Sequence, residues 1–368
     1  MDISKKFLPD GRANLAEFTL PELERWFVEE LGEPRFRAEQ VWQWIWRKLE
    51  RDFDSMSNVS KKLRQKLKEK AAIALPEIEK IRESSDGSVK MLLRLSDGEK
   101  IETVLIPAEN RMGNIRWSQC LSTQAGCPMR CSFCATGQMG FKRNLTMGEI
   151  LGQVAIGREY LDDRRLDWPT LRNLVFMGMG EPLLNLDALI PALESLASEK
   201  GMNFSPRRLT VSTCGIPGAL EKLGESGLAY LAVSLHAPTR ELREELMPGA
   251  AKWPLEDMMA ALESYPLKTR ERVTYEYLLL GGVNDSPDHA RALAKLLSRT
   301  RGKVNLIVYN PVPGLPYKRP SDETVAAFQK ILFDKNIMCI VRKSRGADIE
   351  AACGQLAIEE PVEREKTP

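Results

Sequence analysis

The segment QCLSTQAGCPMRCSFCATGQMGFKRNLTMGEILGQVAIGREYL, residues 119–161, joins a short apolar strand to a helix through a loop that holds three cysteines. Cys127, Cys131 and Cys134 all lie within this loop. The helix carries its own start signal, because Thr146 can cap it and Glu149 completes a capping box. A strand, a loop and a capped helix in this order are the repeating unit of an α/β fold.

The same alternation continues toward the C-terminal end of the chain. Helices such as the one predicted at 286–299 separate apolar strands, and strands that are apolar on both faces usually pair in parallel. Six or seven such units predict a barrel or a partial barrel, in which the chemistry lies at the C-terminal ends of the strands. The further strands are predicted at 171–178, 207–213, 229–236, 272–280, 303–310 and 337–343.

The first hundred residues follow a different pattern. Helices are predicted at 19–34, where Thr19 and Glu22 form a capping box and Gly32 ends the helix, at 37–50 and at 60–70. The basic helix 60–70 is either a solvated helix face, which is the more common case, or a surface that contacts phosphates. Alternating residues on both sides of Asp97-Gly98 predict a hairpin. We therefore expect an accessory domain with a connecting hairpin at 1–100, a barrel at 101–355 and a tail at 356–368.

Composition limits where the protein works and what its cysteines do. The chain of 368 residues is 43% hydrophobic, and it has neither a signal-like N-terminus nor an apolar run of the about 20 residues that a membrane span needs. A cytoplasmic protein without a membrane partner is the expectation. Because cytosolic thiols stay reduced, clustered cysteines indicate metal ligands or catalysts rather than disulfides. The net charge of +2 does not by itself indicate nucleic acid, so an RNA site would need local basic patches.

Three thiols without a fourth ligand are unusual for zinc, whose structural sites take four Cys or His ligands. The two histidines, His236 and His289, lie far away in the sequence. Three thiolates suit a 4Fe-4S cluster with one iron left open. Cys-x3-Cys-x2-Cys after a first barrel strand is the signature of radical S-adenosylmethionine (SAM) enzymes, whose open iron chelates SAM. A zinc-binding RNA module and an iron–sulfur electron carrier or sensor are the alternatives from other classes.

Polar residues and two further thiols collect where the predicted strands end. Cys120 lies on the first strand and Cys353 on a small-residue turn after the last one, so a redox or nucleophilic pair at one mouth is geometrically possible. Cys214 and Cys339 are expected to be packed in or beside strands. Each polar strand end alone could be a turn or a helix cap, but together they form a ring on the face expected to bind a cofactor: Gly178, Gly180, Glu181, Ser212, Ser234, His236 and Asn310.

Several of these motifs resemble one family. The segments CLSTQAGCPMRCSFCATGQMGFKRNLT (120–146), GMGEPLLN (178–185), VSLHAP (233–238), YNPVPG (309–314) and IVRKSRGADIEAACGQLA (340–357) are similar to the RlmN-type radical SAM RNA methyltransferases of the RlmN/Cfr family. PRFRAEQVWQWIW and IETVLIP extend the resemblance into the N-terminal part. It implies a radical SAM partial barrel of (βα)6 type that methylates C2 of adenosine in large-subunit (23S) rRNA and in tRNA. Cfr-type methylation of C8 of the same rRNA adenosine is the alternative.

The resemblance also implies a reaction scheme that uses two SAM molecules per turnover. Cys353 takes a methyl group from the first SAM, and the cluster reduces the second. The resulting radical removes hydrogen from the S-methyl group, and the methylene radical adds to C2. Glu102 then accepts the C2 proton, although without the resemblance an exposed strand glutamate would be the simpler interpretation. Cys120 attacks the Cys353 sulfur, which releases the methylated RNA and leaves a Cys120–Cys353 disulfide.

Matching positions carry further expectations. The implied partners are rRNA and tRNA and an electron-donating reductase such as flavodoxin, and a monomer is expected. The implied SAM-binding residues are Gly180, Glu181, Ser212, Ser234, Leu235, His236 and Asn310. Candidate RNA contacts flank the expected mouth at Lys142, Arg143, Arg207, Arg208, Arg342, Lys343 and Arg345, with the basic helix 60–70 as a further surface.

Overall fold

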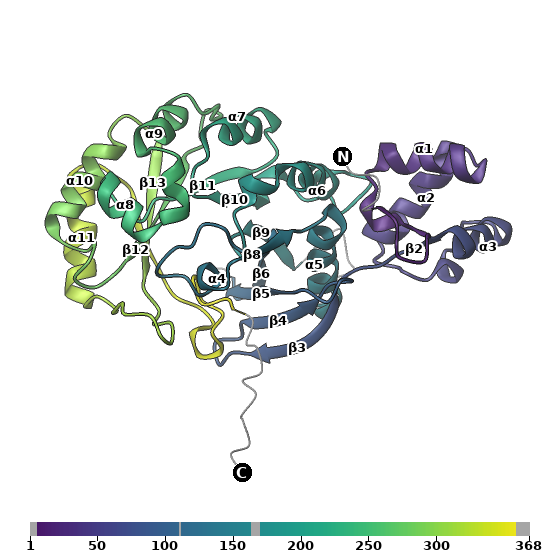
Figure 1. The fold of residues 1–368 in the computed structure, drawn as a ribbon, viewed down its shortest axis with the longest axis horizontal. Helices are drawn as coiled ribbons and strands as arrows, with labels where there is room; N and C mark the ends of the chain where they lie inside the picture. The colour runs from purple at the N-terminus through teal and green to yellow at the C-terminus, as the bar shows by residue number, and fades with distance from the viewer. Residues whose placement is uncertain (1–5, 110–111, 163–169, 358–368) are drawn as a thin grey trace, which may run out of the picture.

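A single ten-stranded sheet organises most of the chain (Figure 1). The computed structural model describes residues 6–109, 112–162 and 170–357, so residues 358–368 of the predicted tail lie outside the described part. The strands follow one another in space in the order β14-β13-β12-β11-β10-β9-β6-β5-β4-β3. The described strands form an open sheet, because β14 and β3 are its two edges.

Seven of these strands are parallel and form the predicted partial barrel. Each of the first six of these strands along the chain is followed by helical segments that lead back to the next parallel strand, which confirms the α/β prediction. The strands are β6 (Ile115–Cys120), β9 (Leu171–Phe176), β10 (Leu209–Thr213), β11 (Tyr230–Ser234), β12 (Val273–Leu279), β13 (Gly302–Val308) and β14 (Cys339–Arg342). The helices are α5 (Met147–Tyr160), α6 (Leu186–Ala197), α7 (Pro217–Ser226), α8 (Arg240–Leu246), α9 (Leu255–Glu263), α10 (Pro287–Leu297) and α11 (Asp322–Asp334).

Three antiparallel strands extend the sheet beyond β6. They are β3 (Glu77–Glu83), β4 (Val89–Arg94) and β5 (Lys100–Glu109). The hairpin predicted around Asp97-Gly98 is confirmed as the turn between β4 and β5. Its register places Lys90 of β4 opposite Val104 of β5, and Val104 opposite Cys120 of β6. The hairpin therefore reaches the strand end that carries a candidate catalytic thiol.

The N-terminal helices pack beside the barrel, at the right-hand end of Figure 1. They are α1 (Leu20–Leu31), α2 (Arg35–Trp46) and α3 (Lys61–Lys70), with the short paired strands β1 (Ala13–Asn14) and β2 (Ala71–Ala72). The capping box of α1 and the left-handed Gly32 at its end are both present as predicted. Trp42 and Trp46 are buried in edge-to-face contact with ring centroids 6.0 Å apart.

A buried carboxylate joins this N-terminal unit to the barrel. Glu17 accepts hydrogen bonds from the Thr146 hydroxyl (2.6 Å) and from the backbone N–H of Gly148 (3.0 Å), at the start of α5. Burial raises the pKa of Glu17 to about 7. The capping box of α5, formed by Thr146 and Glu149, is present as predicted.

The remaining elements are short. A hairpin of β7 (Gln124–Gly126) and β8 (Phe141–Asn144) encloses α4 (Ala135–Gln138). Single 3₁₀ turns lie at Leu15–Glu17, Phe53–Ser55, Pro182–Asn185, Pro206–Arg208, Pro248–Lys252 and Ala347–Ile349. Among the helices of the described residues, none combines the length and apolar character that crossing a membrane requires.

Candidate active site

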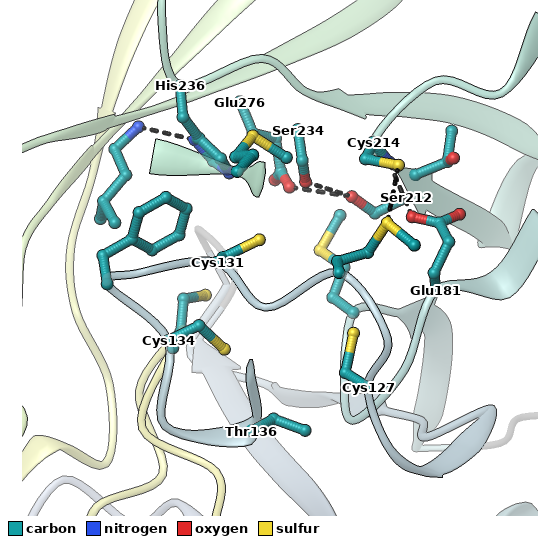
Figure 2. A pocket seen from close by; sticks show the side chains of 18 of the residues that line it. Cys127, Cys131, Cys134, Thr136, Glu181, Ser212, Cys214, Ser234, His236 and Glu276 are labelled. Atoms are coloured by element: carbon teal, nitrogen blue, oxygen red, sulfur yellow. Dashed lines mark hydrogen bonds between the residues drawn. The ribbon is translucent and has the colours of Figure 1, made fainter. Parts of the chain in front are cut away.

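A cavity of about 150 Å³ opens at the C-terminal ends of the parallel strands (Figure 2). The side chains of the cysteine motif line one side of it, and polar strand ends line the other. The sequence-predicted residues that it brings together are Cys127, Cys131, Cys134, Gly178, Gly180, Glu181, Ser212, Ser234, His236 and Cys353. Leu235 and Asn310, also expected to bind SAM, are buried but are not among the residues that line this cavity.

Backbone hydrogen bonds hold the loop of the three cysteines, which we call the cluster loop (residues 127–134). The N–H of Cys127 donates to the carbonyl of Gly140 (2.8 Å). The carbonyl of Met129 accepts from Gly249 (2.9 Å), and the N–H of Ser132 donates to Leu246 (2.9 Å). The cluster loop is therefore tied both to its own hairpin and to the segment after α8.

The chemistry of these three thiols fits an iron–sulfur cluster. Burial is the largest cause that raises the pKa of each, to about 12 for Cys127, so a neighbouring positive charge is needed to make them thiolates. Within the described ranges, no three His, Cys, Asp or Glu side chains converge on a site for one metal ion. Three thiolates that bind different irons suit a 4Fe-4S cluster with one iron left open.

The opposite wall of the cavity is a hydrogen-bonded polar surface (Figure 2). The carboxylate of Glu181 accepts from the backbone N–H groups of Leu183 (3.0 Å) and Cys214 (2.8 Å). The Ser212 hydroxyl lies 3.3 Å from that of Ser234 and donates to the Glu276 carboxylate (3.1 Å). This wall offers both negative charge and hydroxyl groups to a ligand.

Two residues of this wall have backbone conformations with positive φ. Gly180 has φ 101°, and a Cβ there would meet the side chain of Gln124 at 2.5 Å, so glycine is required. His236 has φ 53°, and its Nδ1 accepts from the N–H of Leu278 (3.0 Å). Burial lowers the pKa of His236 to about 3, so the imidazole is neutral and its proton is on Nε2.

The thiols of Cys120 and Cys353 lie within electrostatic range of each other. Burial is the largest cause that raises the pKa of Cys120, and the Cys353 thiol raises it further. Cys353 is exposed, but it lines the cavity that also contains the cluster loop. Both thiols are free in this structure, so the predicted transient disulfide stays a prediction. Cys214 and Cys339 are buried as expected, and Cys214 also lines the cavity.

The segment that carries Cys353, which we call the thiol loop (residues 346–357), is held largely by side chains. Asp348 accepts from the Ser84 hydroxyl (2.5 Å) and from the N–H and hydroxyl of Ser85 (both 3.0 Å). Asp86 accepts from the N–H of Gly346 (2.9 Å). A backbone hydrogen bond joins the thiol loop to the residue directly after the cluster loop. The N–H of Ala135 donates to the carbonyl of Gly354 (2.8 Å).

Glu102 is buried, so interpreting it as an exposed strand glutamate is wrong. Its side chain is only 5% exposed and forms an ion pair with Lys90 (3.1 Å). Its second carboxylate oxygen accepts from the N–H of Ala357 in the thiol loop (3.0 Å). Burial raises the pKa of Glu102, and Lys90 opposes this shift.

Several cations expected to contact RNA are already engaged within the protein. Arg143 binds Asp97 (2.5 Å) and both carboxylate oxygens of Glu149 (2.8 Å each), and Arg208 donates to Asn173 (3.2 Å). In α3, the side chains of Arg64, Lys66, Lys68 and Lys70 all bond to α1, to Glu33 or to Asp54. Most of the positive charge of α3 therefore stabilises the N-terminal unit.

Sequence reasoning missed several residues that line the cavity, and two of them contact predicted site residues. Glu276 lies in β12 and is 5% exposed, and its signal was available as a carboxylate inside the otherwise apolar strand RVTYEYLLL. Phe133, between two cluster cysteines, packs edge-on against His236 with ring centroids 5.0 Å apart. Sequence offers no signal for that contact, because it joins two segments that only the fold brings together.

Comparisons with known proteins agree with this geometry. Residues 13–73 match the family described as ribosomal RNA large subunit methyltransferase N-terminal domain, and residues 121–294 match the radical SAM superfamily. A radical SAM methyltransferase of Sphaerobacter thermophilus has a similar structure, with a TM-score of 0.86, 42% identity, and coverage of 93% of this chain and 98% of that one. The fold and the cavity of three cysteines thus define a radical SAM enzyme.

Sequence relatives narrow the class further. The dual-specificity RNA methyltransferase RlmN of Nitratidesulfovibrio vulgaris (strain DSM 19637 / Miyazaki F) is 61% identical over 350 residues, which are 95% of each chain. The protein of the same name from Lawsonia intracellularis (strain PHE/MN1-00) is 56% identical over 93% of this chain and 96% of its own. The chain belongs to the RlmN family of radical SAM RNA methyltransferases. This membership favours the RlmN type over the Cfr type and confirms the resemblance.

Proposed function

We propose that this enzyme methylates C2 of adenosine in 23S rRNA and in tRNA through a methyl group carried on Cys353. One observation supports this most strongly: Cys353 and the three cysteines of the cluster loop line the same cavity. An electron carrier or a zinc-binding module would have no use for an additional thiol at this place.

Two groups fit the two walls of the cavity. Cys127, Cys131 and Cys134 would hold a 4Fe-4S cluster with one iron open, and the polar wall would hold SAM. The carboxylate of Glu181 suits the ammonium group of the SAM methionine, and Gly180 lets that group approach the backbone. When bound, the reduced cluster supplies the electron that cleaves SAM homolytically. Ser212, Ser234 and His236 line this wall, and the buried residues Leu235 and Asn310 complete the proposed SAM surface.

The two thiols divide the carbon transfer between them. The Cys353 sulfur accepts a methyl group, and its carbon, after losing one hydrogen atom, bonds to C2 of the adenine. The protein and the RNA are then joined through a methylene bridge. The adenine radical formed by this addition would return one electron to the oxidised cluster, and C2 loses its proton. Cys120, as thiolate, then attacks the Cys353 sulfur. The carbon–sulfur bond breaks with its electron pair on the methylene carbon, that carbon takes up a proton to become a methyl group, and the methylated RNA leaves. The Cys120–Cys353 disulfide that remains has to be reduced before the next cycle.

Glu102 accepts the proton that C2 loses before this release. Its carboxylate lies on the same sheet face as Cys120, since β5 and β6 pair in register at Val104 and Cys120. A buried carboxylate is a suitable proton acceptor, because burial raises the pKa of Glu102 and so makes the carboxylate more basic.

We further infer the setting in which the enzyme works. The N-terminal accessory domain (1–100) and the basic residues around the mouth hold folded RNA by its phosphates and shape. Lys142, Arg207 and Lys343 are the best candidates, because they are exposed. A flavodoxin-like reductase supplies electrons to a monomeric enzyme. The cytoplasm, which contains these RNAs and keeps thiols reduced, is the proposed compartment.

One experiment tests the proposed function directly. The reconstituted enzyme is incubated anaerobically with SAM, a reductant and 23S rRNA or tRNA, and the RNA is digested to nucleosides. Mass spectrometry with chromatographic standards should detect 2-methyladenosine. Detection of 8-methyladenosine would instead indicate Cfr-type chemistry, and SAM cleavage without RNA methylation would exclude both.

A further inference from the structure

The buried pair of Lys90 and Glu102 lies on the sheet face that carries Cys120. Lys90 is opposite Val104, and Val104 is opposite Cys120, so these three side chains point to one face. Glu102 precedes Val104 by two residues and therefore points to the same face. A lysine, a carboxylate and the resolving thiol thus stand on three neighbouring strands.

The pair also fastens both ends of the segment that carries Cys353. The Lys90 ammonium bonds to one oxygen of Glu102 and donates to the backbone carbonyl of Glu350, each at 3.1 Å. The other oxygen of Glu102 accepts from the N–H of Ala357 at 3.0 Å. Glu350 and Ala357 enclose Cys353 in the sequence, so the Lys90–Glu102 pair holds the thiol loop on both sides of the thiol, Lys90 at Glu350 and Glu102 at Ala357.

Stability alone does not explain such a pair. The two side chains are each only 5% exposed, and lysine and glutamate are seldom buried this completely. A buried ion pair is often no more stabilising than apolar residues of the same size, because both charges lose their hydration. Arg82 of β3 also lowers the pKa of Glu102, by less than Lys90 does; it lies 3.7 Å from the Glu350 carboxylate and is 30% exposed. Lys90 is therefore the dominant charge facing Glu102.

We propose that Lys90 is a positioning residue of the methylation reaction, which keeps Glu102 in the carboxylate form and ties it to the loop that carries Cys353. This inference rests on the proposed role of Glu102 as the proton acceptor. When Glu102 takes the C2 proton it becomes neutral, and its attraction to the Lys90 ammonium disappears. Proton transfer thus loosens the thiol loop at the stage when the Cys353 sulfur has to meet Cys120.

Removal of the Lys90 charge should make the proton transfer dependent on pH. Burial raises the pKa of Glu102 and Lys90 lowers it, so Lys90→Met should raise this pKa further. Single-turnover RNA methylation by enzyme already methylated on Cys353 should then be about tenfold slower at pH 7. The rate should approach that of the unchanged enzyme as the pH rises further. The unresolved protein–RNA adduct should accumulate at pH 7 and decline as the pH rises.

Matched variants separate this role from a structural one. Lys90→Arg keeps the charge and should retain the original pH profile. Asp348→Asn loosens the same loop at a position that does not touch Glu102, so it should slow methylation equally at every pH. If Lys90→Met is insoluble, Lys90→Gln, which keeps a donor for the Glu350 carbonyl, gives the same comparison.

The outcomes distinguish the inference from the proposed function. A Lys90 variant with an unshifted pH profile, in an enzyme that Glu102→Gln inactivates, overturns the inference alone. A Glu102→Gln enzyme that methylates RNA at the original rate overturns the role of Glu102 and the inference with it. A shifted profile that Lys90→Arg restores supports both.

Discussion

The cluster loop and the thiol loop face the same cavity, but different interactions hold them in place. Backbone hydrogen bonds to the carbonyls of Gly140 and Leu246 and from the N–H of Gly249 hold the cluster loop in place. Such bonds do not change with pH. The thiol loop depends on three carboxylates, Asp86, Glu102 and Asp348, and on a single lysine. A cluster needs constant geometry, whereas a thiol with the role proposed for Cys353, which first accepts a methyl group and then meets Cys120, has to move. The backbone bonds of the cluster loop and the carboxylate contacts of the thiol loop therefore match the roles proposed for these two loops.

The largest expected effect is the loss of cluster binding when a ligand in the cluster loop is replaced. Replacing Cys131 by Ala removes one of three proposed ligands, and cluster binding should be lost together with reductive SAM cleavage. Iron content and deoxyadenosine formation measure this. If the variant kept full SAM cleavage, Cys131 would not be a ligand.

Gly249→Ala should disturb the cluster loop without touching a ligand. A Cβ at Gly249 would lie 2.4 Å from the carbonyl oxygen and 2.5 Å from the Cα of Met129. Because backbone atoms cannot move aside cheaply, we expect a destabilisation of about 1–3 kcal/mol and reduced iron binding. Gly218→Ala is the control, since no atom lies within 4 Å of its added Cβ. Equal iron content in both variants would show that the loop adapts.

The smallest expected effect is on the thiol loop. Asp348→Asn removes a carboxylate whose pKa is lowered to about 2, chiefly by the Ser84 hydroxyl. Hydrogen exchange at residues 346–357 should accelerate, while iron content stays unchanged. In the unchanged protein this attachment is complete above about pH 4 and is lost as the pH falls toward 2. Asp288→Asn, at an exposed ion pair with Arg291, is the control. Unchanged exchange in Asp348→Asn would show that the loop does not need this carboxylate.

Local signals in the sequence predicted much of the fold. Thr19, Glu22 and Gly32 delimit α1 because capping is decided within a few residues. Apolar runs between helices indicated parallel strands, because such runs also lie within a few consecutive residues. The cluster cysteines and Cys353 were found because their spacing and their motifs are local as well.

The contacts that hold the thiol loop could not be predicted in this way. Lys90 belongs to an alternating strand segment, and its burial against Glu102 depends on the register of β4 against β5. The availability of charged side chains is equally hard to predict. From the sequence, Arg143 is a candidate RNA contact, but in the fold its guanidinium group forms ion pairs with Asp97 and Glu149. Pairings between distant segments arise from tertiary structure, so a single sequence does not reveal them.

The central claim is that Cys353 carries the carbon and Cys120 releases it. Cys120→Ala tests it most directly, because its proposed role begins only after the bond to adenine has formed. The variant should bind the cluster, become methylated on Cys353 and accumulate a covalent protein–RNA adduct, seen on denaturing gels and removed by nuclease. The adduct should be absent from the Cys120→Ala, Cys353→Ala double variant. If Cys120 only packs in β6, its loss should cost about 1 kcal/mol of stability and produce no adduct. A soluble, cluster-loaded Cys120→Ala enzyme that releases methylated RNA without the adduct would contradict the account.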